Sequence, residues 1–161
     1  MENIGTSLNH IELDIDLKVA RFSGKLNLNV YYEDTDLSGY VYHANYLKYC
    51  ERSRSELIDV KLVRDLFKKG VHFVVAEANL KYKKPALYGD SLVVCTELEI
   101  SKSPKTKVHH RVFKENGDRP IVEAEILLVL VDANGRPIET PDFMFDLIAK
   151  TINQNSKLAQ S

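Results

Sequence analysis

The sequence predicts an α+β fold in which one long helix is wrapped by a five-stranded antiparallel sheet. A stretch without Gly or Pro runs from Ala44 to about Val60 and places its apolar residues at helical spacing. After Gly70 four β-type segments follow one another, separated by short turns, and one earlier alternation supplies a fifth strand. Because such a sheet must cover one apolar face, the long helix is the expected cover.

The size and composition of the chain indicate one domain with a real core. It has 161 residues, of which 44% are hydrophobic, and its 22 basic and 23 acidic residues nearly cancel. No arginine-rich block is present, so nucleic-acid binding is not expected. Cys50 and Cys95 form neither a disulfide framework nor a metal knuckle, and both are expected to be small buried residues in a reduced compartment. The amino terminus lacks a signal-peptide pattern and no aliphatic run approaches the ~18 residues of a membrane span, which predicts a soluble, cytoplasmic protein without a transmembrane segment.

Residues 1–23 are interpreted as an amino-terminal arm ahead of a single domain formed by residues 24–161. Apolar residues alternate over residues 11–19, a pattern typical of a strand, which indicates either an added edge strand or a partly ordered arm. A second alternation over residues 26–32 predicts a firmer strand that ends near Glu33.

Two helices are expected between this strand and the rest of the sheet. Residues 44–60 carry the long helix. A second, short helix is expected over residues 62–69, because Gly70 stands where the residue just past a helix end is commonly found.

Four strands are predicted after Gly70, within residues 71–84, 91–101, 107–117 and 120–135. Asn116-Gly117 and Asn134-Gly135 are strong hairpin signals. The run from Ile126 to Val131 is apolar at every position, so its strand is expected to be buried on both faces or central in the sheet. The tail after Pro141 is expected to form a short helix that frays.

The residues best suited to chemistry lie in EDTDLSGYVYHANY, residues 33–46, where an acidic cluster precedes a helix start. A helix amino terminus carries unpaired N–H groups and a partial positive charge, which can polarise a carbonyl oxygen. A carboxylate facing such an oxyanion site is a working pair for attack on an acyl group. From the residues alone, the simpler interpretation is that Asp34 and Asp36 are turn and capping residues.

A resemblance to a known family decides between these interpretations. The stretch VYYEDTDLSGYVYHANYLKYCERSRSEL is similar to the signature of the hotdog-fold acyl-CoA thioesterases related to 4-hydroxybenzoyl-CoA thioesterase, and most closely to their Tol-Pal-associated branch. The downstream KKPALYGDSLVV also fits, and the resemblance runs from about Gly24 to Pro141. It implies a hotdog fold, hydrolysis of an acyl-CoA thioester to a free acid and coenzyme A, and no metal or other cofactor.

The resemblance also implies roles for particular residues. Asp36 takes the position of the family's catalytic aspartate and would act either as nucleophile or as general base for water. His43 matches the histidine of the acyl-CoA thioesterases in this branch; its backbone N–H would polarise the thioester carbonyl, and its imidazole could donate a hydrogen bond or a proton. Tyr42 and Asn45 flank His43 and are expected to shape or brace the substrate site, although simple packing explains them equally well.

Other polar residues are weighed against the same site. Coenzyme A carries phosphates that need basic groups outside the pocket, and Lys105 is chosen as their contact from two lysine-rich segments, residues 102–107 and 81–84. Glu51, on the long helix, is ranked below Asp36 as a catalytic carboxylate and is expected to pair with a neighbouring arginine or lysine.

Three further expectations concern the surroundings of the site. Repulsion from Glu33 and Asp34 could raise the pKa of Asp36, unless their side chains alternate away from it. Tyr40 departs from the family pattern, in which a small aliphatic residue more often follows the glycine, and this affects the expected shape of the acyl pocket. The histidines on the strands have no metal-ligand spacing and are expected to be structural or surface residues: His72, His109 and His110.

Two other functions are weighed against acyl-CoA hydrolysis. A dehydratase of hydroxyacyl thioesters would share the fold, but its pattern of histidine followed by glycine and proline is absent. An interaction module that docks an acyl carrier protein or a membrane-biogenesis partner, with little hydrolysis, is the alternative from a different class; the intact Asp36 and His43 argue against it.

Hotdog relatives pair so that two sheets continue edge to edge, which implies a homodimer or a homotetramer by analogy. A five-stranded sheet leaves an open edge that a partner must cover, and the amino-terminal arm could cover such an edge instead.

Overall fold

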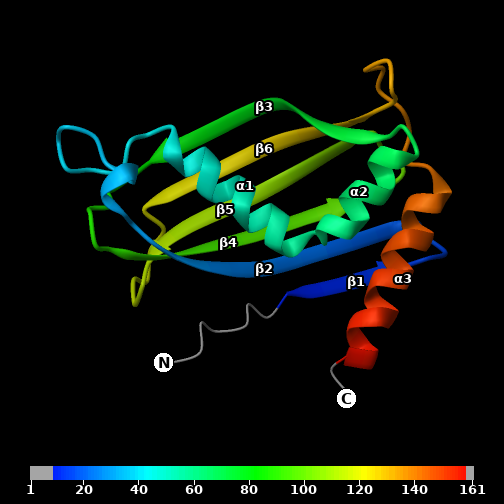
Figure 1. Ribbon diagram of the computed structural model, residues 1–161, viewed down its shortest axis with the longest axis horizontal. Helices are drawn as coiled ribbons and strands as arrows, with labels where there is room; N and C mark the ends of the chain where they lie inside the picture. The colour runs from blue at the N-terminus through cyan, green and yellow to red at the C-terminus, as the bar shows by residue number, and fades with distance from the viewer. Residues whose placement is uncertain (1–8, 159–161) are drawn as a thin grey trace.

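The structure is a computed structural model that describes residues 9–158 (Figure 1). Its strands are β1 (His10–Asp14), β2 (Val19–Asn29), β3 (His72–Tyr82), β4 (Ser91–Ile100), β5 (Lys105–Lys114) and β6 (Val122–Val131). Its α-helices are α1 (Asn45–Leu57), α2 (Val60–Lys68) and α3 (Asp142–Leu158), and a short 3-10 turn forms at Tyr32–Asp34. The predicted long helix, the second helix and the four later strands are all present.

All the strands form one antiparallel, six-stranded sheet in the order β1-β2-β4-β5-β6-β3. The predicted α+β hotdog fold is confirmed, with one strand more than expected, because residues 10–14 pair with residues 19–23. Of the alternation over residues 11–19, only residues 11–14 lie in this added edge strand, and residues 15–18 form the turn that leads into β2. The boundary expected after residue 23 falls inside β2, which is continuous from Val19, while the expectation for residues 1–8 lies outside the described residues.

The sheet curves around α1, which lies across its inner face (Figure 1). One cluster of buried residues gathers around Tyr46 and Tyr49 in the first part of α1. A second cluster joins the end of α1, through Leu57, to α2, α3 and the other half of the sheet. Cys50 on α1 is buried as expected, whereas Cys95 on β4 is only half-buried. The first cluster holds the start of α1, where the candidate site lies, firmly against the strands.

The apolar strand β6 lies inside the sheet, between β5 and β3, as its sequence predicts. Ile126 and Leu130 are buried in the core under the helices. Val129 and Val131, which alternate with them along the strand, are buried as well. This strand is therefore covered on both faces over its second half.

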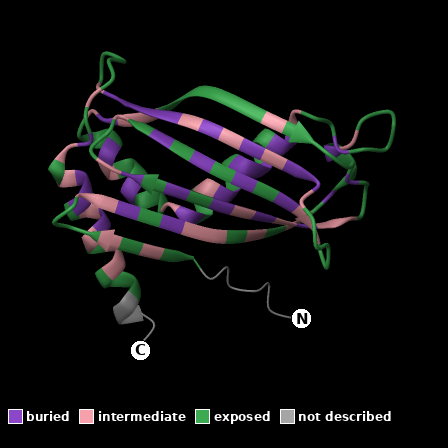
Figure 2. Ribbon diagram, turned by 180° about the vertical axis from the view of Figure 1, so that it is seen from behind, coloured by how far each residue is buried: buried purple, intermediate pink, exposed green. Residues whose placement is uncertain are grey.

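The outer face of the sheet remains largely uncovered, and buried and exposed residues alternate along its strands (Figure 2). Ion pairs between neighbouring strands occupy this face: Arg21–Glu99 at 2.8 Å, Arg111–Glu97 at 3.3 Å and Lys107–Glu125 at 3.2 Å. Exposed pairs of this kind contribute roughly 0–1 kcal/mol each. They favour the observed strand pairing and leave the core to the helix side of the sheet.

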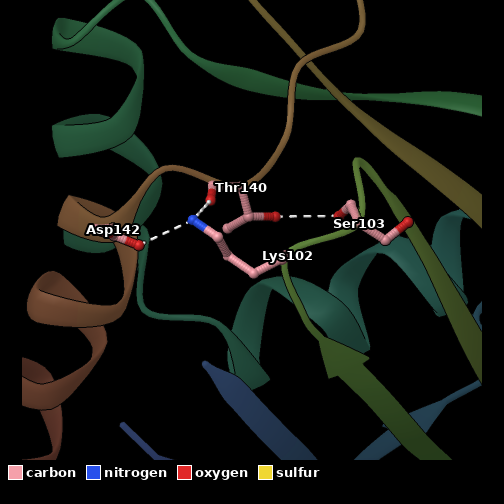
Figure 3. Close-up of polar contacts among 4 residues, drawn as sticks. All are labelled: Lys102, Ser103, Thr140 and Asp142. Carbon is pink, nitrogen blue, oxygen red and sulfur yellow. Dashed lines mark hydrogen bonds and ion pairs between the residues drawn. The ribbon is translucent and has the colours of Figure 1, made fainter. Parts of the chain in front are cut away.

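Helix α3 spans 17 residues and is longer than the short helix expected from the sequence. Its start is held to the turn between β4 and β5 (Figure 3). Lys102 Nζ donates to Asp142 Oδ1 at 2.9 Å and to the Thr140 carbonyl oxygen at 3.2 Å, and Thr140 Oγ1 donates to the Ser103 carbonyl oxygen at 3.1 Å. Phe145, one turn further on, is fully buried in the core. The tail is therefore an integral part of the fold.

Candidate active site

The acidic segment is a turn followed by a loop, and not the end of a strand. β2 stops at Asn29 and a 3-10 turn follows at Tyr32–Asp34, so the expectation that the strand continues to Glu33 is wrong. The cause is local: Asp34 Oδ2 accepts a hydrogen bond of 2.8 Å from the Tyr31 N–H, which turns the chain back on itself.

Asp36 lies in a small loop that a bridge between Thr35 and Val41 closes. The Asp36 N–H donates to the Tyr40 carbonyl oxygen at 2.9 Å across this loop. Gly39 has a φ of +79°, in the left-handed region that glycine adopts without strain. The loop is therefore a defined structure that fixes the direction of the Asp36 side chain.

The Asp36 carboxylate is stabilised as an anion mainly by one neighbour. Its Oδ1 accepts hydrogen bonds from the Ser38 hydroxyl and from the Ser38 N–H, the latter at 2.8 Å. These two hydrogen bonds, with a smaller contribution from His43, hold the pKa of Asp36 below its ordinary value. Of the two alternatives for Glu33 and Asp34, repulsion that raises this pKa does not hold, because neither residue is among the causes that act on Asp36. Asp36 is therefore ionised at neutral pH.

His43 stands just before the first turn of α1. The helix begins at Asn45, and Ala44 before it provides no side-chain cap. The Asn45 N–H already donates to the Tyr42 carbonyl oxygen at 2.8 Å, so the donor left for a ligand at this helix start lies one step earlier in the chain. Within residues 9–158 the His43 N–H donates to no acceptor, while the His43 carbonyl oxygen accepts a hydrogen bond of 3.0 Å from the Tyr82 hydroxyl. The imidazole lies against the Tyr42 ring, with 4.4 Å between centroids.

Asp34 and Asn45, both buried, join the acidic segment to the helix start. The Asp34 carbonyl oxygen accepts hydrogen bonds from the Tyr42 N–H at 2.8 Å and from Asn45 Nδ2 at 2.9 Å. Burial, and after it the negative charge of Asp34, raises the pKa of Tyr49 far above its ordinary value, so this phenol stays neutral. The amide of Asn45 is thus used inside the protein, where it braces the loop against α1.

Asp36 and His43 line the same pocket, which has a volume of about 370 Å³. Tyr46 and Tyr82 supply aromatic walls, with 5.8 Å between their ring centroids. Tyr40, the residue that departs from the family pattern, also lines the pocket, together with Val41, Lys83, Lys84 and Pro85. Asp36 and the helix-start residue His43 therefore border one space of a size that admits part of a small molecule.

All three residues expected to bind substrate lie outside this lining, Asn45 because it braces the loop, and Tyr42 and Lys105 for other reasons. Tyr42 is half-exposed and meets the site only through the His43 ring. Lys105, at the start of β5, lines a different cavity of about 540 Å³ together with Arg21 and Glu99. Within one chain the structure does not bring Lys105 to Asp36.

Glu51 lies in a third pocket, between α1, α2 and β3, and not with Asp36. Its Oε1 accepts a hydrogen bond of 2.5 Å from the Ser55 hydroxyl. The ion pairs of residues 9–158 do not include Glu51, so the expected pairing with an arginine or lysine is wrong.

His110 belongs to a buried polar network beneath α1. Its Nδ1 lies 2.8 Å from Thr96 Oγ1, which in turn lies 2.6 Å from Ser53 Oγ, and its Nε2 lies 3.2 Å from Arg54 Nη1. Burial, followed by the charge of Arg54, lowers the pKa of His110 to about 3. The neutral ring that fits this network accepts from Arg54 and donates to Thr96. His110 is thus structural, whereas His109 is exposed on the outer face.

Several residues of the site were not anticipated from the sequence. Ser38 carried a signal, since Asp followed two residues later by Ser and then Gly is a common turn pattern. Tyr46 also carried one, because it lies on the helix one turn past His43. Tyr82 and Lys84 carried no such signal in the sequence. They reach the site only because the end of β3 lies beside the start of α1 in the folded protein.

The part of the chain that the structure describes contains neither a metal-binding cluster nor a membrane-spanning helix. Among residues 9–158 no three His, Cys, Asp or Glu side chains gather in a way that could hold a metal ion. None of the helices in that part of the chain is both long enough and apolar enough to cross a membrane.

Comparison with known proteins identifies the family. Residues 30–148 match the model of the thioesterase-like superfamily. The putative acyl-CoA thioesterase YneP of Bacillus subtilis is 36% identical over 117 residues, which are 71% of this chain and 85% of that protein. The acyl-CoA thioester hydrolase YbgC of Escherichia coli O157:H7 is 35% identical over 108 residues, 65% of this chain and 79% of that protein. Among solved structures, the DHNA-CoA thioesterase of Staphylococcus aureus has a TM-score of 0.67 at 24% identity and covers 84% of this chain and 94% of its own.

The sheet wrapped around α1 and the matched segment, which includes the acidic loop and the helix start, together define a hotdog-fold protein of the thioesterase class. The chain belongs to the thioesterase-like superfamily. The family and the enzyme class expected from the sequence, a thioester hydrolase, are confirmed.

Proposed function

We propose that this protein hydrolyses acyl-CoA thioesters to a free acid and coenzyme A, with Asp36 and the start of α1 at the reacting carbonyl. The observation that carries the proposal is the pocket that Asp36 and His43 both line, together with a His43 N–H that donates to no acceptor within residues 9–158. The choice of coenzyme A esters as the substrates is based on the relatives, because YneP is named a putative acyl-CoA thioesterase and YbgC an acyl-CoA thioester hydrolase.

The start of α1 would stabilise the charge that develops on the thioester. A carbonyl oxygen placed at the His43 N–H becomes negative during attack, and the unpaired N–H together with the positive end of the helix favours that charge. The hydrogen bond from Tyr82 to the His43 carbonyl oxygen would hold this peptide in place. A thioester has a good leaving group, so one preorganised donor and one carboxylate can suffice.

Asp36 would attack in one of two ways. As nucleophile, its carboxylate forms an anhydride with the acyl group and releases the coenzyme A thiolate, and water then hydrolyses the anhydride. As general base, it takes a proton from a water molecule that attacks the carbonyl directly. In both routes the thiolate must gain a proton, and the His43 imidazole, which lines the same pocket, is suited to supply it.

The phosphates of coenzyme A need cations near this pocket. Lys84 lines the pocket and has no ion-pair partner within residues 9–158, whereas Lys83 is paired with Glu123 at 2.8 Å. Lys84 is therefore the phosphate contact that one chain can offer. Lys105 would serve this purpose only if a second subunit brought its cavity to the Asp36 pocket.

We also propose a homodimer, or a pair of dimers, in a cytoplasmic location. β3 forms an uncovered edge of the sheet, and unpaired edges invite pairing with another chain. Cys50 and Cys95 are both free thiols, which suits a reducing compartment.

Thiol release from short, long and aromatic acyl-CoA esters tests the proposed function. Asp36→Asn should lose at least about 100-fold in rate while it stays folded, because a positioned acid or base contributes roughly 10²–10⁴-fold. His43→Ala should lose less, since its backbone N–H remains. Glu33→Gln, which removes an exposed carboxylate from the same segment but outside the pocket, is the matched control and should keep the native rate.

Two results would contradict the proposed function. If no ester is cleaved by the native protein, acyl-CoA hydrolysis fails, and an interaction module that docks an acyl carrier protein or a membrane-biogenesis partner becomes the better explanation. If esters are cleaved and Asp36→Asn is as fast as native, the assignment of Asp36 fails and Glu51 becomes the next carboxylate to test.

A further inference from the structure

A second pocket of about 240 Å³ lies between α1, α2 and β3, and we refer to it as the distal pocket. In Figure 1, α1 and α2 form a V over the sheet that opens toward β3. Apolar side chains from these elements supply much of the lining, among them Ile58, Leu66 and Phe73. Its polar lining residues include Arg54 and Glu51 of α1 and His72 of β3.

Arg54 is a half-buried cation that forms no ion pair among the described residues, although the charge of Glu51 attracts it from a distance. Its Nη1 donates to the neutral His110 ring at 3.2 Å, and the ion pairs of residues 9–158 do not include it. Glu51, the acidic residue one turn earlier on α1, bonds instead to Ser55. A charge removed from water without a partner is costly, and a guanidinium binds a carboxylate through two parallel hydrogen bonds. Arg54 is therefore prepared for an anionic group.

His72 provides a second polar group without a partner in the same lining. Its Nδ1 is buried and makes no hydrogen bond among the described residues. Leaving a buried polar atom unpaired is unfavourable, and native proteins do so rarely. The lining of this largely apolar pocket thus contains a cation without an ion pair, Arg54, and a buried nitrogen without a hydrogen bond, His72 Nδ1. A ligand could supply the missing partners.

The distal pocket and the Asp36 pocket are both lined by α1 on one side and β3 on the other. A helix rises about 1.5 Å per residue, so Arg54 lies about 14 Å along the axis from Asn45, where α1 begins. An extended chain gains about 1.2 Å per bond, since a residue with three backbone bonds spans at most about 3.6 Å. A chain of roughly ten to twelve bonds therefore matches the length of α1 that separates the two pockets.

We propose that the distal pocket binds the far end of the acyl chain and that Arg54 selects chains of this length that end in a carboxylate. The inference rests on the proposed function, because it places the thioester of the same substrate at Asp36. The methylene groups would lie against Ile58 and Phe73, and the terminal carboxylate would pair with the Arg54 guanidinium. Glu51 opposes a second carboxylate in this pocket, so neutralising it strengthens the preference.

Hydrolysis of dodecanedioyl-CoA and dodecanoyl-CoA, which differ only at the far end of the chain, tests the proposal. The native protein should favour the diacid ester in kcat/KM by roughly tenfold to hundredfold, the usual effect of one charge-assisted hydrogen bond. Arg54→Gln, which can still donate to His110, should abolish this ratio, and Arg54→Lys should keep part of it. Glu51→Gln should raise the ratio, and Arg64→Gln, the same exchange at an exposed arginine of α2 outside this lining, is the matched control and should leave it unchanged.

Hexanoyl-CoA, whose chain is too short to reach the distal pocket, separates selection from misfolding. Each variant should hydrolyse it at close to the native rate, and the ratio between the two long esters is independent of the amount of folded enzyme. A native preference for dodecanoyl-CoA, or a ratio that Arg54→Gln leaves unchanged, overturns the proposal while the proposed function stands.

Binding of free dodecanedioic acid, measured by calorimetry, keeps the two proposals distinguishable. Arg54-dependent binding of the diacid in a protein that cleaves no ester would support the distal pocket and overturn only the hydrolytic function. Absence of diacid binding in a protein that cleaves hexanoyl-CoA would overturn only the distal pocket.

Discussion

Asp36 receives its principal stabilisation as an anion from Ser38, two residues further along the chain. The resemblance to the thioesterases identified Asp36 and His43 from the sequence, and the structure places both in one pocket. The sequence left open whether Glu33 and Asp34 raise the pKa of Asp36 or turn away from it, because a count of neighbouring charges ignores where each side chain points. Asp34 uses its carboxylate on the Tyr31 N–H, and Ser38 donates to Asp36.

Ser38→Ala should move the acidic limb of the pH–rate profile to higher pH. The hydroxyl of Ser38 is the largest cause of the lowered pKa of Asp36, so its removal lets that pKa rise toward the ordinary value of 3.8. Since the proposed role needs an ionised carboxylate, kcat/KM should fall at acidic pH and change little at neutral pH. Ser91→Ala, which removes a hydroxyl that donates to Asn29 away from the pocket, should leave the profile unchanged. An unmoved limb in Ser38→Ala would mean that another group titrates.

His110 makes the stability of the fold depend on pH. Burial and the charge of Arg54 lower the pKa of His110 to about 3, while the ordinary value is 6.5. Between these two pH values the unfolded chain binds a proton that the folded chain does not, so stability falls as the pH decreases from 6.5. The slope contributed by one such group approaches about 1.4 kcal/mol per pH unit.

His110→Gln should flatten this dependence. Urea unfolding at pH 7 and at pH 5 should show a smaller loss of stability for His110→Gln than for the native protein, although the variant starts from a lower value at pH 7. His109→Gln replaces the exposed neighbour on β5 and should retain the native loss. Equal losses in the native protein and His110→Gln would show that the ring is not held neutral in the folded state.

At the scale of elements, periodicity located nearly every helix and strand, and side-chain contacts decided the ends. β2 stops at Asn29 because Asp34 turns the chain, a contact that the alternation up to Tyr32 does not reveal. α1 begins at Asn45, one residue from the predicted start at Ala44, and its sequence without Gly or Pro supports the helix that follows. The start of α3 after Pro141 was predicted, but its length was underestimated because residues 153–158, which were expected to fray, continue the helix. Periodicity therefore predicts the type of an element, whereas individual side-chain contacts such as that of Asp34 set its ends.

Thr140→Val should weaken the attachment of α3. Thr140 is buried, and its hydroxyl donates to the Ser103 carbonyl oxygen in the turn between β4 and β5 (Figure 3). Valine keeps the shape and leaves that carbonyl unpaired, so the free energy of unfolding should fall by about 1–2 kcal/mol in a urea titration. Thr151→Val removes a comparable hydroxyl that donates to the Leu147 carbonyl oxygen within α3 and should cost less, because the helix ladder also serves that carbonyl. A larger cost for Thr151→Val than for Thr140→Val would contradict this account.

At the scale of the whole molecule, the two edges of the sheet differ. β1 forms one edge and is short, with five residues, whereas β3 forms the other with 11 residues. Val74 and Val75 near the start of β3 are 38% and 56% exposed. A long edge strand with exposed apolar residues is a template for pairing, and proteins that remain monomeric usually protect such edges with charge. The outer face of the sheet, with its paired charges, offers no comparable apolar surface.

The proposed homodimer is therefore expected to form through β3. Val74→Lys combined with Ala78→Lys places two positive charges on each copy of the edge, where a symmetric pair would bring like charges together. Sedimentation velocity should give at least two chains per particle for the native protein and a shift to single chains for the double variant.

Leu17→Lys adds one charge at a position that is 72% exposed in the turn between β1 and β2, and it should leave the assembly intact. A native protein that sediments as single chains, or a double variant that assembles as before, would contradict pairing through this edge. If the double variant is monomeric and also loses hydrolysis of hexanoyl-CoA, the Asp36 pocket is incomplete in one chain, and a contribution of Lys105 from the neighbouring subunit becomes testable by Lys105→Ala in the native dimer.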